Sequence, residues 1–119
     1  PAQFQAANWH DPAAAPDDAT PPMVRQRNLG AATKFMWPIP DRGLTRRLGF
    51  IEAPTLVLHG ASDGLVPVAY GQRLAGLIPN AAFQAIEGAG HLPMVEAEAA
   101  FAGAVDSFLA VESHWGHRQ

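Results

Sequence analysis

The sequence predicts an α/β fold in which parallel strands alternate with helices. A short apolar run at 55–60 (TLVLHG) is typical of a strand that is buried on both faces of a parallel sheet. A second strand pattern lies at 82–86 (AFQAI), and a helical pattern follows each strand, at 67–78 and at about 96–110. The order strand, helix, strand, helix predicts two parallel strands that a right-handed crossover joins.

Residues 1–22 predict a loop or linker, because they hold five of the eleven prolines and proline fixes φ and donates no backbone hydrogen bond. Phe4 and Trp9 indicate that this segment packs on another part of the protein. A helix is expected to begin at Thr20, which is suited to capping it. It should end before Trp37, because a residue that precedes proline avoids the helical region.

Residues 41–50 predict a polar connector to the first strand. Its Arg42, Arg46 and Arg47 would fit an anionic substrate, but a solvated connector is the preferred interpretation. After the first strand, Pro67 lies in the first turn of the next helix. The last helix has an apolar stripe that predicts its buried side, namely Phe101, Ala104, Val105, Phe108 and Leu109.

The composition limits the class of protein. Among 119 residues, 48% are hydrophobic and 16% are charged, so the chain can bury a core. The net charge of −3 and the lack of a basic run argue against a nucleic-acid partner. No apolar run approaches the roughly 20 residues that span a bilayer. The absence of cysteine excludes disulfides and thiolate zinc sites but does not fix the compartment, and a cytoplasmic location is favoured.

Two loops carry the candidate chemistry, and each directly follows a strand. The first loop contains Asp63 and the second contains His91. Reactive residues in open α/β sheets lie beyond the carboxyl ends of the strands, so the two side chains should emerge side by side. A carboxylate beside a histidine fixes the imidazole tautomer and stabilises the imidazolium form. We therefore expect a hydrogen bond between them, with a distance of about 2.6–3.2 Å.

The same residues carry a resemblance to a known family. The segment LVLHGASD at 56–63, with Val66-Pro67 after it, resembles the acid strand and loop of the α/β-hydrolase family. The segment GAGH at 88–91, followed by Glu96 and Phe101, resembles its histidine loop and last helix. The resemblance covers about residues 52–110. It implies a C-terminal part of a hydrolase sheet with flanking helices, in which Asp63 is the catalytic acid and His91 the base.

The family's nucleophile motif, G-x-S-x-G, does not occur in this sequence. The resemblance therefore implies that the nucleophile and oxyanion hole lie upstream, in a missing N-terminal core or a partner chain that completes the sheet. The first residue, Pro1, is expected not to be the natural translation start. Residues 1–50 would then be a remnant of the cap with its return connector, 51–112 the core and 113–119 a tail.

Several single residues have competing interpretations. Ser62 adjoins Asp63, but no second base explains a nucleophile there. His59 is better explained as a partly buried structural residue, and His114 with His117 as a solvated tail rather than a metal site. The candidate residues of a substrate pocket are Trp37, Met36, Val66 and Leu92, with Trp9 and Phe35 as further aromatic candidates. For the aromatic and Met side chains, core packing is the preferred alternative.

Two hypotheses of function remain. In the first, the intact parent is a serine-type hydrolase that acts on an ester, thioester, amide or carbon–carbon bond of a small molecule, without a metal or organic cofactor. The family also includes dehalogenases, epoxide hydrolases and cofactor-free haloperoxidases. In the second, the chain is a binding or regulatory remnant of the fold. An in-frame G-x-S-x-G just upstream would favour the enzyme, and a nearby start codon would favour the remnant.

Overall fold

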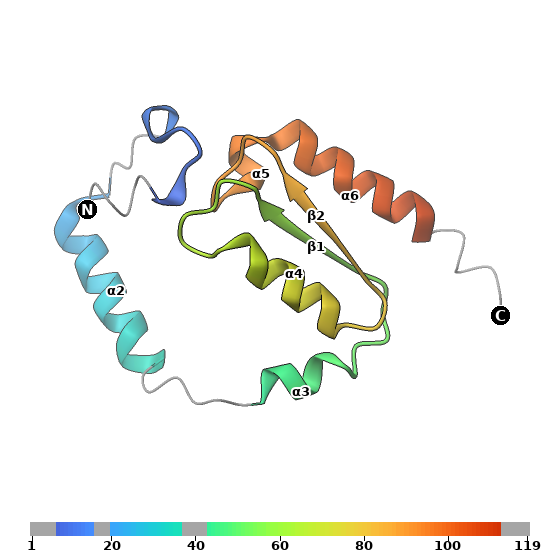
Figure 1. Ribbon diagram of the computed structural model, residues 1–119. Coiled ribbons are helices and arrows are strands. Elements are labelled where there is room, and N and C mark those ends of the chain that lie inside the picture. The colour runs from blue at the N-terminus through green and yellow to red at the C-terminus, as the bar shows by residue number, and fades with distance from the viewer. Residues whose placement is uncertain (1–6, 16–19, 37–42, 113–119) are drawn as a thin grey trace.

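A computed structural model describes residues 7–15, 20–36 and 43–112 of the chain. These ranges contain two strands and six helices (Figure 1). In chain order the elements are η1 (Pro12–Ala14), α2 (Pro22–Met36), α3 (Leu44–Leu48), β1 (Thr55–Gly60), α4 (Val68–Leu77), β2 (Ala81–Ile86), α5 (Pro93–Glu96) and α6 (Glu98–Glu112). The predicted order of strand, helix, strand, helix is confirmed, and α2 occupies the segment in which the sequence predicts a helix. The predicted end of that helix, before Trp37, adjoins residues outside the described ranges.

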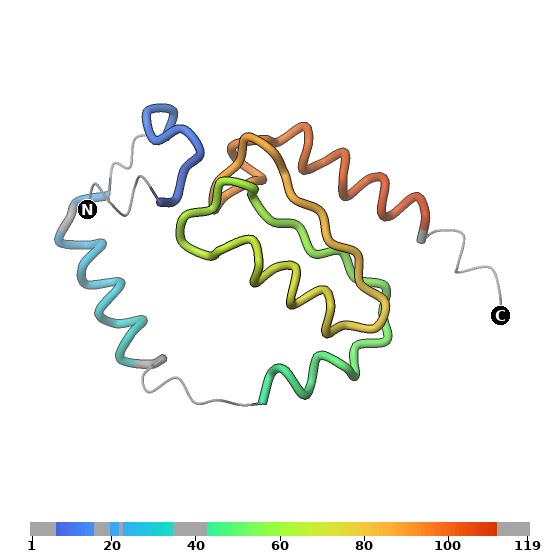
Figure 2. The backbone as a smooth tube through the Cα atoms, in the orientation of Figure 1, coloured from blue at the N-terminus to red at the C-terminus, as the bar shows by residue number. Residues whose placement is uncertain are grey.

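The two strands lie side by side and run in the same direction (Figure 2). Thr55 lies opposite Ala81 and Gly60 lies opposite Ile86, with no slip in register between them. Because the strands are parallel, their carboxyl ends lie at the same edge of the sheet. The loop after β1 and the loop after β2 therefore start next to each other, as the α/β prediction requires.

Helices α4 and α6 cover opposite faces of the sheet. Gly71 of α4 is packed against β1 and β2, since a Cβ there would lie 2.8 Å from the His59 ring and 2.9 Å from the Phe83 ring. On the other face of the sheet, Leu58 packs against a hydrophobic cluster formed by Ile86, Ala89 and Ala104 of α6. Neighbouring residues of a strand point to opposite faces, so the sheet is sandwiched between the two helices.

The sheet is less buried than the sequence predicts. Gly60 is the buried residue of β1, and the other five residues are half-buried. In β2, Ile86 is 2% exposed, whereas Gln84 is exposed. The apolar run predicts burial within a larger sheet, and among the described residues β1 has a single hydrogen-bonded neighbour. A parallel strand with one open edge lacks the neighbour that would complete its burial.

The predicted connector at 41–50 contains a helix, α3, so that prediction is wrong for residues 44–48. The helix begins after Gly43, whose φ of 67° is the left-handed conformation that glycine adopts freely. Leu48 is 8% exposed, and α3 packs against α4. Arg46 and Arg47 occupy the last turn, where positive charge stabilises the carboxyl end of a helix. Packing of a single leucine thus converts a polar segment into a helical turn.

The last predicted helix, at about 96–110, corresponds to α6, and the short helix α5, which the sequence did not predict, precedes it. Ala97 separates them with φ −137° and ψ 54°, which lies outside the helical region. The Glu96 side chain, at the end of α5, accepts hydrogen bonds from the backbone N–H groups of His10 and Gly90. Helix α5 therefore contacts the loops, whereas α6 packs on the sheet. Leu109 is 57% exposed, so its predicted burial is wrong. A two-stranded sheet is too narrow to cover the whole predicted stripe of α6.

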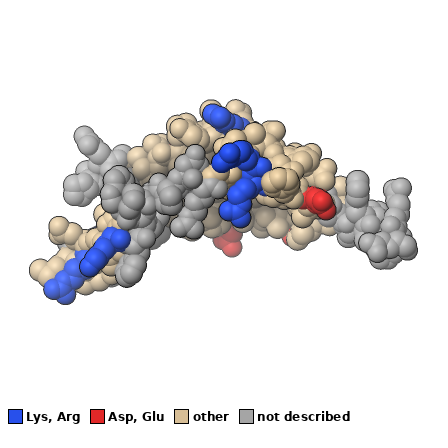
Figure 3. Space-filling view, turned by 90° about the horizontal axis from the view of Figure 1, so that it is seen from below, with Lys and Arg blue, Asp and Glu red and all other residues tan. Residues whose placement is uncertain are grey.

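Helix α2 exposes large apolar side chains. Met23 and Leu29 are 68% and 67% exposed. Figure 3 shows Lys and Arg side chains in separate groups on the face seen from below rather than as one continuous basic surface. In the described part of the chain, no helix combines the length and hydropathy that a membrane span requires.

Candidate active site

Asp63 is held by its own loop. It follows β1, and its Oδ1 accepts hydrogen bonds from the backbone N–H of Leu65 at 2.8 Å and of Val66 at 2.9 Å. An aspartate that accepts from the backbone two or three residues later is a common local turn. The Asp63 side chain is 5% exposed. Local contacts therefore fix the direction of its carboxylate.

His91 lies in a loop that contacts from outside hold in place. Gly88 starts the loop with a φ of 69°, a left-handed conformation that suits glycine. The Gly90 N–H donates to Glu96 Oε1 at 2.8 Å. The His91 N–H donates to the Asn8 carbonyl oxygen at 2.6 Å. The backbone of the histidine loop thus depends on two other segments.

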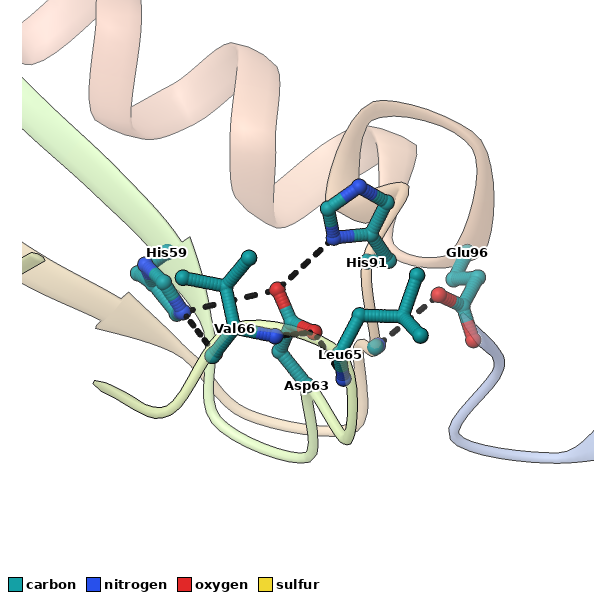
Figure 4. A network of polar contacts seen from close by, with 7 residues as sticks. His59, Asp63, Leu65, Val66, His91 and Glu96 are labelled. Atoms are coloured by element: carbon teal, nitrogen blue, oxygen red, sulfur yellow. Dashed lines mark hydrogen bonds and ion pairs between the residues drawn. The ribbon is translucent and has the colours of Figure 1, made fainter. Parts of the chain in front are cut away.

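The two loops bring Asp63 and His91 into direct contact (Figure 4). His91 Nδ1 lies 2.9 Å from Asp63 Oδ2, so the distance expected from the sequence is confirmed. Since a carboxylate only accepts, Nδ1 carries the proton of this bond and Nε2 lies on the opposite side of the ring. The His91 side chain is 40% exposed, which leaves Nε2 accessible to a reacting group.

The surroundings of Asp63 favour its charged form. Burial is the largest single influence and raises the pKa of Asp63, but the combined hydrogen bonds outweigh it. The Val66 N–H, the His91 ring and the Leu65 N–H lower this pKa, and the net result is a pKa below the usual value of 3.8. The carboxylate is therefore negative at neutral pH, as a residue that orients a histidine must be.

His59 supports the acid loop from the end of β1. Its Nε2 lies 2.8 Å from the Val66 carbonyl oxygen, so Nε2 carries a proton. The same nitrogen lies 3.4 Å from Asp63 Oδ2, and the His59 side chain is 11% exposed. These contacts fit the structural role that the sequence predicts for His59.

Ser62 has a histidine partner that the sequence did not reveal. His10 Nδ1 lies 2.8 Å from Ser62 Oγ, so a possible base is present after all. A nucleophile also needs N–H groups that can stabilise an oxyanion. The backbone N–H groups of the acid loop already donate to carbonyl oxygens: Ser62 to Ala89, Asp63 to Gly60 and Gly64 to Ala7. This loop therefore offers Ser62 no oxyanion hole.

The predicted pocket residues divide into two groups. Val66 and Leu92 adjoin the Asp63–His91 pair, and each is 36% exposed. Trp37 and the side chain of Met36 lie outside the described residues. A hollow of about 380 Å³ opens elsewhere, beside Trp9 and Glu96. Among the described residues, no three His, Asp or Glu side chains are grouped to hold a metal ion.

Comparisons with known proteins show which family this chain resembles. Residues 8–98 match the family model described as the alpha/beta hydrolase fold, a match that begins well before residue 52. The chain is 44% identical over 63 residues to a 2-hydroxy-6-oxononadienedioate/2-hydroxy-6-oxononatrienedioate hydrolase of Cupriavidus pinatubonensis, covering 53% of this chain and 22% of that protein. It is 41% identical over 78 residues to the biotin biosynthesis bifunctional protein BioHC of Teredinibacter turnerae, covering 66% and 13%.

The fold also resembles a solved structure, the A129V mutant of the meta-cleavage product hydrolase CumD. The TM-score is 0.64 at 20% identity, and the match covers 92% of this chain and 44% of that one. The chain thus corresponds to less than half the length of the proteins that it resembles. Since the family model matches more than half of this chain, the chain belongs to the α/β-hydrolase fold family.

Proposed function

We propose that this chain supplies the catalytic acid, Asp63, and the catalytic base, His91, of a serine-type hydrolase. The observation that carries the proposal is the 2.9 Å contact between His91 Nδ1 and Asp63 Oδ2. This contact joins the loops after two neighbouring parallel strands, and reactive groups in open α/β sheets lie at that position. The lowered pKa of Asp63 keeps the carboxylate charged when the imidazole takes a proton.

The proposed mechanism assigns a different task to each ring nitrogen of His91. Nε2 takes the proton of the nucleophile and later gives it to the leaving group, while Nδ1–H stays bonded to Asp63. The nucleophile and the oxyanion hole come from polypeptide beyond these 119 residues, because the sequence holds no G-x-S-x-G. Val66 and Leu92 are exposed apolar residues beside the pair and would contact the substrate.

An ester is the first candidate substrate. Hydrolysis of a carbon–carbon bond in a 2-hydroxy-6-oxo acid is the second, and the specific observation in its favour is the 44% identity to a hydrolase named for such compounds. Purified complete protein assayed with p-nitrophenyl esters and with a 2-hydroxy-6-oxodienoate would separate the two. Turnover of only the dienoate would replace the ester proposal.

The proposal is tested by His91→Ala in the complete protein that carries this chain. Loss of proton transfer should lower kcat by roughly 10⁴-fold or more. The sequence immediately upstream should contain an in-frame G-x-S-x-G. Near-normal turnover of the variant would contradict the assignment, and a start codon close before Pro1 would favour a non-catalytic remnant.

The 119-residue chain by itself is expected to be inactive toward p-nitrophenyl acetate. It is also expected to be marginally stable or to aggregate, because β1 has a run of apolar residues and, among the described residues, a single neighbouring strand. Size-exclusion chromatography and an ester assay beside the His91→Ala chain check both points. The variant serves as the control for slow esterolysis by surface imidazoles. Multiple turnover that disappears in the variant would show that the chain holds its own nucleophile.

A further inference from the structure

Residues 7–10, which we call the strap, lie against the acid loop. The Gly64 N–H donates to the Ala7 carbonyl oxygen at 3.0 Å. At the other end of the strap, His10 Nδ1 lies 2.8 Å from Ser62 Oγ. The strap therefore contacts the residue on each side of Asp63.

The strap also lies against the histidine loop. The Asn8 carbonyl oxygen accepts the His91 N–H at 2.6 Å. The His10 N–H donates to Glu96 Oε2 at 2.6 Å. Three of these four contacts use backbone groups of the strap, so its path matters more than its side chains. One four-residue segment thus bridges the two loops that hold Asp63 and His91.

Both loops have a glycine where the strap crosses them. A Cβ at Gly64 would lie 2.9 Å from the Ala7 carbonyl oxygen. A Cβ at Gly90 would lie 2.5 Å from the Asn8 carbonyl oxygen and 2.9 Å from the Trp9 carbonyl carbon. Such approaches are too close for an ordinary side chain, so the loops fit the strap only because these positions carry none. This steric fit is independent of the hydrogen bonds.

Glu96 connects the strap to the histidine loop through both carboxylate oxygens. Oε1 accepts the Gly90 N–H and Oε2 accepts the His10 N–H, and the close-up view shows the first of these bonds beside His91 (Figure 4). A carboxylate is suited to this task because both of its oxygens are acceptors. A glutamine of the same shape has one acceptor, and its NH₂ group would face a second donor.

We infer that Glu96 is a positioning residue, which fastens the strap to the histidine loop and so holds His91 against Asp63. The catalytic meaning of this role rests on the proposed function, whereas the positioning itself can be measured without any turnover. Glu96 acts through the backbone of residues 90 and 10 and not on the reacting atoms. The strap, Gly64 with Gly90, and the Glu96 carboxylate together then set the distance between the two loops.

The test compares Glu96→Gln with Glu98→Gln in the complete protein that carries this chain. The control removes the same charge two residues away, from an exposed glutamate. Two quantities are measured: hydrogen exchange of segments 7–10 and 88–91, and the tautomer of ¹⁵N-labelled His91 in long-range ¹H–¹⁵N spectra. In Glu96→Gln, exchange of both segments should accelerate by about tenfold. His91 should also lose its exclusive Nδ1–H form, and Glu98→Gln should keep it.

A second pair of variants protects the test against a folding defect. Gly64→Ala displaces the strap from the acid loop and leaves Glu96 intact, while Gly103→Ala adds a methyl group into open space on α6. The inference requires Gly64→Ala to accelerate exchange of both segments and Gly103→Ala to change neither. An unaltered His91 tautomer in Glu96→Gln, or in a folded Gly64→Ala, would overturn it. Normal turnover of His91→Ala would instead defeat the proposed function and leave these results standing.

Discussion

The acid loop and the histidine loop are built in different ways although their side chains meet. Asp63 receives hydrogen bonds from Leu65 and Val66, two and three residues further along the same loop. His91 depends on Asn8, whose carbonyl oxygen accepts its N–H from 83 positions earlier in the chain. The Asp63 carboxylate is therefore oriented by its own loop, whereas the backbone of His91 is held by a segment that meets it only after folding.

We expect the two loops to differ in stability for the same reason. A turn closed over three residues loses little entropy on forming, whereas a contact between distant segments must offset a larger loop-closure cost. We therefore expect the acid loop to keep its shape when contacts outside it are lost. The histidine loop should be the part that moves first.

Among the changes that test the contrast between the two loops, the largest expected effect comes from Asp63→Asn in the complete protein. Asparagine Oδ1 can still accept from Leu65 and Val66, so the acid loop should keep its conformation. Its NH₂ group cannot accept from His91 Nδ1–H, so the imidazole would be held in the wrong tautomer, and kcat should fall by roughly 10²–10⁴-fold. Steady-state kinetics measure the loss. If Asp63→Asn also unfolded the acid loop, the expectation that this loop is held by its own residues would be wrong.

Gly60→Ala should have the next largest effect, because Gly60 lies where the two loops meet. A Cβ there would overlap the Gly90 carbonyl oxygen and lie 2.6 Å from that of Ala89. Both atoms belong to the backbone, so relief requires the histidine loop to shift, and the free energy of unfolding should fall by about 1–3 kcal/mol. Urea denaturation measures this change.

The matched control for Gly60→Ala is Gly76→Ala on α4, where a Cβ would meet no atom within 4 Å. Alanine is the better helix former, so this variant should gain about 0.5–1 kcal/mol. If both variants changed stability in the same direction, close contact between the loops would not be the cause.

The sequence was sufficient for the parts of the fold with local signals. The apolar runs of β1 and β2 and the polar residues directly after them predicted the strands, their direction and the Asp63–His91 contact. Asp63 is recognisable because it directly follows a strand and is paired with His91 in the next such loop, although its turn alone would also suit an ordinary loop residue. The catalytic roles of the pair stay a prediction, as does the division of the chain at residues 50 and 112.

The parts that the sequence did not reveal depend on tertiary contacts. The strap contributes mainly backbone groups, and a backbone carbonyl such as that of Asn8 leaves no signature in a sequence. The break at Ala97 has no local signal either, because alanine is the best helix former. Glu96 belongs to the family motif, but its two hydrogen bonds depend on the tertiary positions of the histidine loop and the strap.

The stability of the acid loop should also depend on pH. The pKa of Asp63 is lowered below 3.8 in the folded chain, so the folded state binds fewer protons than the unfolded state near that pH. The resulting stabilisation is fully present above about pH 4–5 and is lost as the pH falls through the folded pKa. As the pH is lowered from about 6 to 3, the urea midpoint should therefore decrease less steeply in Asp63→Asn than in the wild type. Parallel curves would show that Asp63 is not the group responsible.

The smallest expected effect comes from His59, which braces the acid loop from β1. His59→Phe keeps an aromatic ring beside Gly71 and removes the N–H that donates to the Val66 carbonyl oxygen. Val66 is exposed, so water can replace the lost donor, and the free energy of unfolding should fall by no more than about 1 kcal/mol. In the complete protein kcat should change by less than about tenfold, because Leu65 and Val66 still hold Asp63. His59→Gln, which retains a donor, is the companion variant and should recover part of the stability. Thermal unfolding and steady-state kinetics on both variants give the result. If His59→Phe lost as much activity as Asp63→Asn, the acid loop would depend on its neighbours as the histidine loop does, and the contrast between the two loops would be wrong.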